Sequence, residues 1–453
     1  MEHDVVVIGG GPAGLAGALW RMREDPSARV TVLEAQPRVG GWVHTEIVEG
    51  HVCEFGPQAV RPSEELDALV EALGIAEHLV PSSATAKARF IGRHGRLLAV
   101  PTGPGGLLST RLLPFGGKLR ILREPFVKST GSPGESVAAF VERRLGKGAV
   151  PLVHAMVSGI YAGDAGRLEI ESAFPSLFQA ERDHGSVFKG MRAKMRAAGP
   201  RKARPKKAPL YTFEGGMRGL IDAMASALGD RIRTSCPVTA LAHDDTHFTL
   251  RLRDGSTLTA DEVVLACPAR VSAKLLETVD AELARDLAAI PYASLASVYL
   301  GFDATDLPPT LSGFGFLLEP GESPAVLGAI YCHSLFPAHA PAGHGLLRVM
   351  LGGRSHPRIV DLDDETLIQL AVDAVRQYTG FARTMLFRRV VRVRDAIPQY
   401  EAGHAERLRR IATRVERIPG LALRGNSYRA IALQGQLAKP SAIAGASRAV
   451  AMA

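Results

Sequence analysis

The chain has 453 residues, of which 46% are hydrophobic and 22% are charged, a composition typical of folded soluble proteins. Its length exceeds what one ordinary core supports, so at least two packed units are expected. No apolar run approaches the ~20 residues of a membrane-spanning helix, and no basic and apolar leader precedes the first predicted strand, which favours a cytoplasmic protein. Four cysteines without disulfide or metal-ligand spacing predict reduced thiols and no metal site.

The net charge of +8 is unevenly distributed, with one basic stretch between residues 189 and 207. This stretch has nine cations and no acid: Lys189, Arg192, Lys194, Arg196, Arg201, Lys202, Arg204, Lys206 and Lys207. Such a run is typical of a solvated loop, and its Pro-interrupted part, 199–209, is expected to be mobile. It also suits anionic lipid headgroups, which attract each nearby cation by ~1 kcal/mol. Nucleic-acid binding is not expected, because interleaved aromatic residues are missing.

The first predicted elements form a strand–helix–strand unit. Residues 4–8 are a β-branched run, which predicts a buried parallel strand. A helix is expected over 12–23, with proline in its first turn, and a second strand over 29–33 ends at Glu34. This is the βαβ arrangement of a dinucleotide-binding domain.

Beyond this unit the strand signal thins between residues 81 and 209, where Pro and Gly separate helical segments such as 137–145. Strands are expected again over 210–213, 248–252, 262–266, 296–302, 346–351 and 389–393, and an amphipathic helix over 365–378. The pattern predicts an α/β cofactor domain, interrupted by a helical insert, and a second domain with a mixed sheet.

Three glycines connect the first strand to the first helix with the spacing GxGxxG. Gly9 permits the tight turn, Gly11 lets the backbone approach a pyrophosphate, and Gly14 lets the helix pack on the strand. The N-terminus of the helix offers N–H groups and the positive end of its dipole to phosphates. Glu34, 20 residues after Gly14, can accept hydrogen bonds from a ribose diol. A plain glycine turn with a surface glutamate is the alternative interpretation.

A second glycine pair distinguishes FAD from NAD. Gly40 and Gly41 follow Glu34 closely, and Glu54-Phe55-Gly56-Pro57 comes soon after. A simple NAD domain does not need this pair, whereas a longer cofactor that passes a second loop does, because only glycine leaves room for backbone contact. At these residues the sequence resembles the flavin amine oxidase superfamily. FAD is therefore the predicted cofactor.

Within that superfamily the chain is similar to the protoporphyrinogen oxidase family over residues 1 to about 433. The motifs that carry the similarity are Gly40-Gly41-Trp42, Phe55-Gly56-Pro57, Arg89-Phe90, Gly159-Ile160-Tyr161-Ala162-Gly163-Asp164, Phe174-Pro175-Ser176-Leu177-Phe178, Phe213-Glu214-Gly215-Gly216-Met217, Gly313-Phe314-Gly315, Ile397-Pro398-Gln399-Tyr400 and Gly403-His404. The resemblance implies an α/β fold with a Rossmann-like FAD-binding domain (1–82, 230–275, 418–453), a mixed-sheet substrate-binding domain (83–92, 206–229, 276–417) and a helical membrane-associating insert (93–205).

The resemblance also implies the residues that hold cofactor and substrate. FAD would be bound by Gly9, Gly10, Gly11, Pro12, Ala13, Gly14, Glu34, Ala35, Arg38, Gly41, Trp42, Gly56, Pro57, Gln58, Ala59, Val238, Asn426, Ile431, Ala432 and Leu433. A tetrapyrrole would be bound by Arg89 through a propionate, by Gly159 through its backbone, and by the apolar walls Phe314, Leu317, Ile330 and Met350. Physical chemistry agrees, since an apolar disc with carboxylates at its rim needs a mostly hydrophobic pocket with a few cations. Without the resemblance, Arg89 is typical of a solvated surface and Phe314 and Met350 of a core.

The implied reaction is FAD-dependent oxidation of protoporphyrinogen IX to protoporphyrin IX in heme biosynthesis. Six electrons would pass to three O2 and give three H2O2, and the cofactor would carry the chemistry. No catalytic acid or base is assigned, because His154, His184 and His404 are each more typical of structural histidines. The alternatives are a coproporphyrinogen III oxidase that forms coproporphyrin III, an amine oxidase or carotenoid desaturase, and a non-catalytic flavin- or tetrapyrrole-binding protein.

The insert and the C-terminus carry further expectations. In the resembled family the insert binds membrane, so peripheral association with the cytoplasmic face of a membrane is expected; a homodimer is a further candidate. Gly425-Asn426-Ser427-Tyr428 matches the family's flavin-contacting turn. However, Ala430 replaces a family glycine, and Gln434-Gly435-Gln436 replaces the Asn-Asp-Cys opening of a last helix. Because Gln434 is a poor helix cap, we expect a shortened or irregular last helix, with looser flavin binding or a lower reduction potential.

Overall fold

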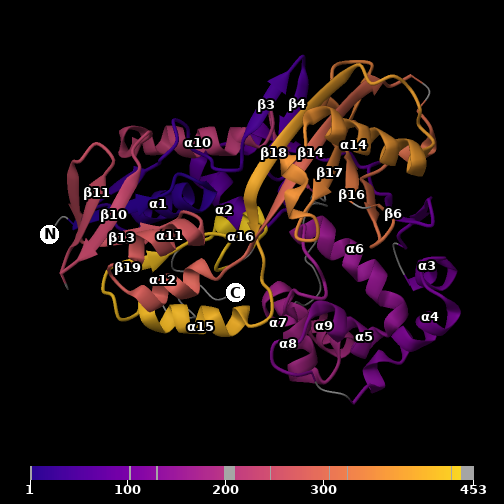
Figure 1. Ribbon diagram of the computed structural model, residues 1–453, viewed down its shortest axis with the longest axis horizontal. Helices are drawn as coiled ribbons and strands as arrows, with labels where there is room; N and C mark the ends of the chain where they lie inside the picture. Colours follow the sequence, from indigo (N-terminus) through magenta and orange to yellow (C-terminus); the bar gives the residue numbers. More distant parts are fainter. Residues whose placement is uncertain are drawn as a thin grey trace.

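The computed structural model describes residues 3–101, 104–128, 131–197, 210–244, 246–305, 307–323, 325–429 and 431–439. Figure 1 shows three parts: a unit with a parallel sheet near the N-terminus, a unit with a larger mixed sheet, and a cluster of helices beside the mixed sheet. Both sheets combine strands that are far apart in sequence.

The first unit is built on a five-stranded parallel sheet in the order β19-β13-β1-β2-β9. Its strands are β1 His3–Ile8, β2 Ala28–Leu33, β9 Ile232–Arg233, β13 Glu262–Leu265 and β19 Leu421–Leu423, and helix α1 Pro12–Glu24 connects β1 to β2. The predicted strand–helix–strand unit is confirmed. Val5 and Val7 of β1 lie in the core that contains α1, whereas Val6 and Ile8 lie in the opposite core. A strand buried on both faces needs the continuous apolar run found in the sequence.

The elements around this sheet are α2 Glu64–Leu73, β5 Leu79–Pro81, β8 Tyr211–Phe213, α10 Arg218–Leu228, β10 Val238–His243, β11 Phe248–Leu252, β12 Thr257–Ala260, α11 Ala269–Leu276, α12 Ala281–Ala288, α15 His404–Val415 and α16 Leu433–Gln436. Helix α10 lies in the range 206–229, which was assigned to the substrate-binding domain from the resemblance. Its buried side chains Leu220, Ile221 and Met224 nevertheless pack into the core that contains α1.

The second unit is built on a seven-stranded sheet in the order β18-β14-β17-β16-β15-β6-β7. Its strands are β6 Arg89–Arg93, β7 Arg96–Ala99, β14 Tyr292–Asp303, β15 Gly315–Leu318, β16 Val326–Tyr331, β17 His344–Gly352 and β18 Phe387–Pro398. Strands β15 and β6 are parallel, and all other neighbours are antiparallel. Helix α14 Asp364–Thr379 covers one face and confirms the predicted helix 365–378. Helix α13 Cys332–Leu335 and the hairpin of β3 Thr45–Val48 and β4 His51–Glu54 also pack against this sheet.

The helical part follows β7. Its helices are α3 Pro104–Ser109, α4 Phe115–Leu122, the short 3₁₀ helix η2 Glu124–Phe126, α5 Val137–Leu145, α6 Val150–Tyr161, α7 Ile170–Ala173, α8 Pro175–His184 and α9 Val187–Ala197. Helix α5 has the bounds that its apolar period predicts. Among the described residues, no helix is long and apolar enough to cross a membrane. The predicted mobile loop, 199–209, lies outside the described residues.

The last described helix is short, as predicted. Helix α16 has four residues and begins after Ala432, which offers no side-chain cap. Gln434 therefore lies inside the helix and not at its cap, which corrects the expected cap position. Ala430 and the tail from residue 440 lie outside the described residues.

Candidate functional site

The glycines of the turn between β1 and α1 have different surroundings. A Cβ atom on Gly9 would lie 2.9 Å from the backbone of Ala266, and one on Gly14 would lie 1.9 Å from the Gly9 carbonyl oxygen. Close packing therefore requires glycine at both positions. A Cβ atom on Gly11 would meet no atom within 4 Å, and Gly11 precedes α1 without a side-chain cap. An open backbone at a helix N-terminus is suited to a phosphate.

A second glycine loop lies directly against this turn. The Cβ position of Gly41, whose φ is +55°, has only the Cα atom of Gly11 as a neighbour, at 3.6 Å. The Gly40 N–H donates to the Gly10 carbonyl at 2.7 Å. The Glu34 carboxylate accepts a hydrogen bond from the Gly10 N–H at 2.7 Å. The structure therefore brings the predicted glycine turn, Glu34 and Gly41 together at the carboxyl ends of β1 and β2.

The loop after β4, which contains Gly56 and Ala59 and is named the Gly56 loop, contacts both the glycine loop and the mixed sheet. A Cβ atom on Gly56 would lie 2.3 Å from the Trp42 carbonyl oxygen, so the two loops touch through their backbones. Ala59 packs against the same small apolar cluster as Phe314 and Ile330. Residues predicted for the cofactor thus meet residues predicted for the substrate.

Two buried side chains fix this loop. The Glu54 carboxylate accepts hydrogen bonds from the Met217 N–H at 2.7 Å and the Thr45 hydroxyl at 2.8 Å, and burial raises the pKa of Glu54 to about 7. The Gln58 amide bonds to Nδ1 of His339 at 3.0 Å, and burial lowers the pKa of His339 to about 4. His339 is therefore neutral at neutral pH and serves as a polar anchor for the loop.

The predicted substrate residues of the mixed sheet share one face. The pairs that set the register are Gly315–Arg89, Gly315–Ile330, Leu317–Gly328 and Gly328–Met350. Because side chains alternate along a strand, the predicted residues of β6, β15, β16 and β17 point to the same side. Phe316, which alternates with them, lies in the core beneath α14. Leu317, Ile330 and Met350 of the predicted wall therefore lie on the face opposite α14, and Phe314, which precedes β15, packs in one cluster with Ile330.

Helix α6 approaches that face at Gly159. A Cβ atom on Gly159 would lie 2.6 Å from Cδ2 of Leu317, so a larger residue would require the Leu317 side chain to move. Ala155, one turn earlier, is fully buried beside Ile91 of β6. Gly159 thus adjoins the predicted wall.

Arg89 lies at the edge of the apolar face. Its Cζ atom is 4.7 Å from the ring centroid of Phe314, a cation–π contact. Desolvation, followed by the positive charge of Arg61, lowers the pKa of Arg89. A guanidinium group at the edge of an apolar wall suits a ligand with carboxylates at its rim.

The three histidines considered as bases lie in separate environments. Nε2 of His154 is 3.8 Å from the Asp164 carboxylate, and His184 is exposed at the end of α8. His404 is buried with its ring stacked on Tyr400 at 4.4 Å, and burial lowers its pKa to about 3. His404 is therefore neutral at the pH at which enzymes work, and its surroundings are those of a core residue.

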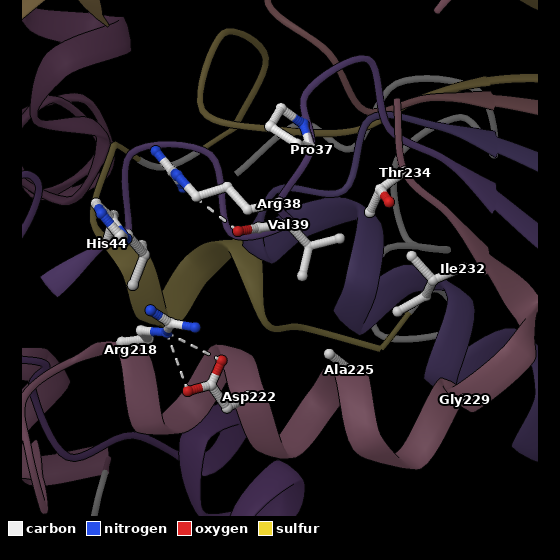
Figure 2. A pocket seen from close by; sticks show the side chains of 11 residues that line it. Pro37, Arg38, Val39, His44, Arg218, Asp222, Ala225, Gly229, Ile232 and Thr234 are labelled. Carbon is white, nitrogen blue, oxygen red and sulfur yellow. Dashed lines mark hydrogen bonds and ion pairs between the residues drawn. The ribbon is translucent and has the colours of Figure 1, made fainter. Parts of the chain in front are cut away.

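Arg38 lies in a cavity of about 370 Å³ between the glycine loop and α10 (Figure 2). Its guanidinium donates to the Gly41 carbonyl at 3.0 Å. Figure 2 shows Arg218 and Asp222 paired on the α10 side of this cavity. Arg38 therefore supports the backbone that carries Gly41.

The remaining predicted cofactor residues come from later segments of the chain. Val238 begins β10, and the Asn426 carbonyl after β19 accepts a hydrogen bond from the Tyr400 hydroxyl. Ile431 packs against the helical core, and the Leu433 side chain is buried in the core that contains α1. Leu433 can therefore meet a ligand only through its backbone.

Comparison with known proteins identifies the fold. A family model described as flavin containing amine oxidoreductase matches residues 12–437. The chain belongs to the flavin-containing amine oxidoreductase family. It is 34% identical to human protoporphyrinogen oxidase over 96% of each chain, and 28% identical to coproporphyrinogen III oxidase of Bacillus subtilis over 95% of each. A solved Exiguobacterium protein assigned as a protoporphyrinogen oxidase superposes with a TM-score of 0.81 at 27% identity, covering 97% of both chains. The predicted resemblance is confirmed.

FAD is the cofactor of this flavin-containing oxidoreductase, and the described residues fit it. The open Gly11 backbone at the start of α1 suits the pyrophosphate. The Glu34 carboxylate beside that turn suits the adenosine ribose. At the contact between the two glycine loops, the Cβ positions of Gly11 and Gly41 have no atom closer than 3.6 Å, which leaves room for a cofactor to approach their backbone.

Sequence patterns give no role to Glu54, which they mark only as the first residue of Glu54-Phe55-Gly56-Pro57, and they do not mark Arg348. The structure places both at the contact between the two sheet units. Arg348 is buried in β17, and its guanidinium donates to the Gly56 carbonyl at 2.7 Å. The signal that could identify it is a lone charge inside the apolar run 346–351, because a buried charge requires specific partners.

Proposed function

We propose that this oxidoreductase oxidises protoporphyrinogen IX to protoporphyrin IX, with FAD as the hydride acceptor and O2 as the final oxidant. Three rounds remove six electrons and give three H2O2, and the bound flavin supplies the redox chemistry. The observation that carries the proposal is the single face of the mixed sheet that combines an apolar wall with an arginine at its edge. A full-length relative named protoporphyrinogen oxidase supports the same substrate.

Each residue has a role that follows from its position. Arg89 binds a propionate, and Leu317, Ile330 and Met350 contact the macrocycle. Gly159 keeps helix α6 close to the wall. The glycine turn and the loop at Gly56 hold the cofactor against this face.

A direct assay tests the proposal. Purified protein reconstituted with FAD is incubated with protoporphyrinogen IX and O2, and porphyrin fluorescence is followed against an enzyme-free autoxidation control. Porphyrin formation above autoxidation, with H2O2 produced at three equivalents per porphyrin, is expected. If flavin is bound and the rate equals autoxidation, the proposal fails.

A coproporphyrinogen III oxidase is the second candidate, and the position of Arg61 favours it. Coproporphyrinogen has more carboxylates than protoporphyrinogen, and Arg61 is close enough to lower the pKa of Arg89. A relative named coproporphyrinogen III oxidase also matches nearly the full chain. Comparing kcat/KM on the two substrates in the same preparation decides between them.

The three-part division is proposed with two adjustments. By packing, α10 belongs with the cofactor unit, and β7 belongs with the mixed sheet. The helical part is proposed to associate peripherally with the cytoplasmic face of a membrane. Among the described residues, nine of the fourteen exposed large apolar side chains lie within 93–205: Phe115, Leu119, Leu122, Phe126, Met156, Ile160, Phe188, Met191 and Met195.

A further inference from the structure

A buried arginine lies at the contact between the two sheet units. Arg348, in β17, is 3% exposed. Its Nε–H donates to the Ser297 hydroxyl at 3.0 Å, and its terminal N–H donates to the Gly56 carbonyl at 2.7 Å. The guanidinium also lies over the Tyr299 ring, with 5.7 Å between Cζ and the ring centroid. These contacts fix the charge in one place.

The charge of Arg348 is only partly balanced. Among the described residues Arg348 has no ion pair within 4 Å, although buried charges are normally paired. The Glu54 carboxyl is close enough for the charge of Arg348 to act on it, but burial raises the pKa of Glu54 to about 7, which weakens it as a counter-charge. Arg348 therefore places a buried guanidinium directly at the Gly56 carbonyl.

Arg348 also lies where the proposed cofactor and substrate residues meet. It is directly opposite Ile330 in the register of β16 and β17, and two residues before Met350 on the same face. Its acceptor, the Gly56 carbonyl, belongs to the loop that contacts the Trp42 backbone. Arg348 therefore connects the substrate wall to the flavin-side loop.

We propose that Arg348 is a positioning residue that fixes the Gly56 loop and supplies a buried positive charge that favours the reduced state of bound FAD. The hydrogen bond to the Gly56 carbonyl orders the loop before the cofactor binds, which lowers the entropy lost on binding. The unbalanced charge stabilises the negative charge that a flavin gains on reduction. The inference rests on the proposed function only in taking the Gly56 loop as the flavin side of the site.

The test compares three variants with the wild-type protein. Arg348→Met removes the charge and both hydrogen bonds, Arg348→Lys keeps the charge, and Arg389→Gln is the matched control. Arg389 is an arginine of the same sheet, in β18 opposite Tyr299, and it pairs with Glu46. The readouts are the FAD dissociation constant, the midpoint potential of bound FAD from dye-coupled reduction, and the circular dichroism of each protein.

The Met variant is expected to bind FAD about tenfold or more weakly, in line with the loss of a charged hydrogen bond, and to have a more negative midpoint potential. The Lys variant is expected to keep the potential and lose part of the affinity, and Arg389→Gln to change neither. A Met variant with unchanged potential and affinity would overturn the inference. If the Met variant does not fold, the Lys variant decides: a preserved potential supports the role of the charge, and a potential that falls contradicts it.

These measurements use FAD alone, so they are independent of the porphyrinogen assay. A chain that shows the expected shifts but no porphyrin formation would refute the proposed substrate and leave the role of Arg348 standing. A chain that turns over protoporphyrinogen, but whose variants all have equal midpoint potentials, would support the proposed substrate and refute the role of Arg348.

Discussion

At the scale of single residues, the proposed role of Arg89 is to bind a carboxylate at the edge of the apolar face. Arg89→Leu removes the guanidinium fork while keeping an apolar side chain over Phe314. We expect KM for protoporphyrinogen to rise about 10- to 100-fold with kcat little changed, because a charged hydrogen bond contributes about 1.5–3 kcal/mol. Steady-state porphyrin fluorescence measures both constants. Arg96→Leu, an exposed arginine on the adjacent strand β7, is the control and should leave both unchanged; a fall in kcat at constant KM would contradict the role of Arg89.

Glu54 makes the stability of the protein depend on pH near neutrality. Its pKa is about 7 in the folded state against 4.5 for a free carboxyl. The folded state therefore holds a proton that the unfolded state has already released between these values. The stabilisation is fully present below pH 4.5, decreases as the pH rises, and is lost above pH 7, for a total of about 3 kcal/mol.

The prediction for Glu54 is tested by comparing the pH dependence of stability in the wild type and in Glu54→Gln. Buried neutral His404 and His339 contribute in the opposite direction, because their lowered pKa values make the folded state lose stability on acidification. The free energy of unfolding is measured in urea at about pH 5 and about pH 8 for the wild type and Glu54→Gln. Subtracting the variant removes the histidine contribution, and the remaining pH dependence should be that of Glu54. Identical pH dependence in both proteins would show that Glu54 titrates normally.

At the scale of elements, the sequence predicts those helices and strands whose formation depends on residues close together in the chain. The β1–α1–β2 unit follows from an apolar run, a glycine turn and an acidic strand end, and all three features are local. Strands β6 and β7 are not predictable in this way. They are short, carry arginines at Arg89, Arg93 and Arg96, and become strands through pairing with β15 and with each other.

In the candidate site, too, the sequence predicts the residues that local patterns mark and misses those that only the fold brings together. The glycine turn and Glu34 are predicted from spacing because the strand ends and the helix start that place them are close together in sequence. The wall residues came from the family resemblance, since nothing in a single strand says which face meets a ligand. The roles of Arg348 and Glu54 are missed because the partner of Arg348, Gly56, and the partner of Glu54, Met217, lie far away in sequence and are brought close only by the fold.

Glu124 links η2 to helix α9. We therefore predict that substituting Glu124 destabilises the helical part. Its buried carboxylate accepts hydrogen bonds from the Ser186 hydroxyl at 2.6 Å and the Val187 N–H at 2.9 Å, and it pairs with buried Arg144. Glu124→Ala removes one of the two counter-charges of Arg144 and leaves Glu181, whose carboxylate is 3.3 Å from the Arg144 guanidinium. Breaking a buried pair typically costs about 3–5 kcal/mol, and the remaining pair should keep the loss at about 3 kcal/mol. We expect a loss of that size in urea unfolding and faster proteolysis near α9.

The matched control for Glu124 is Glu142→Ala. Glu142 pairs at 3.7 Å with Lys147, and both side chains are half or more exposed. A surface pair of this kind contributes at most about 1 kcal/mol. Equal effects of the two substitutions would mean that Glu124 does not anchor α9.

At the scale of the whole molecule, we propose separate roles for the two sheet units and the helical part. The parallel sheet presents backbone groups for the cofactor, and the mixed sheet presents an apolar face at the same contact. Helix α6 extends from that face into the helical part (Figure 1). A ligand that is poorly soluble in water would therefore benefit if the helical part lay on a lipid surface.

The exposed apolar residues of the helical part form stripes on two helices. Phe115, Leu119 and Leu122 are spaced by four and three residues on α4, which places them on one side of that helix. Phe188 and Met191 share a side of α9 in the same way, and the N-terminus of α9 is bonded to η2. The cations of α9 lie beside these residues, a combination typical of helices that bind the interface of an anionic membrane.

Vesicle binding tests this arrangement. The double variant Phe115→Ser/Phe126→Ser removes two side chains that are 77% and 80% exposed. Each fully buried phenylalanine contributes about 1.5–3 kcal/mol, so the double change should weaken binding to vesicles with anionic lipid at least about tenfold in cosedimentation. Ile47→Ser/Leu386→Ser, two exposed apolar residues on the hairpin and before β18, is the matched control and should bind like the wild type. Binding to neutral vesicles should be weaker, and raised salt should lower binding to anionic ones because the cations of α9 contribute. Equal sedimentation of all three proteins, or none with any vesicle, would show that the helical part does not meet the membrane through Phe115 and Phe126.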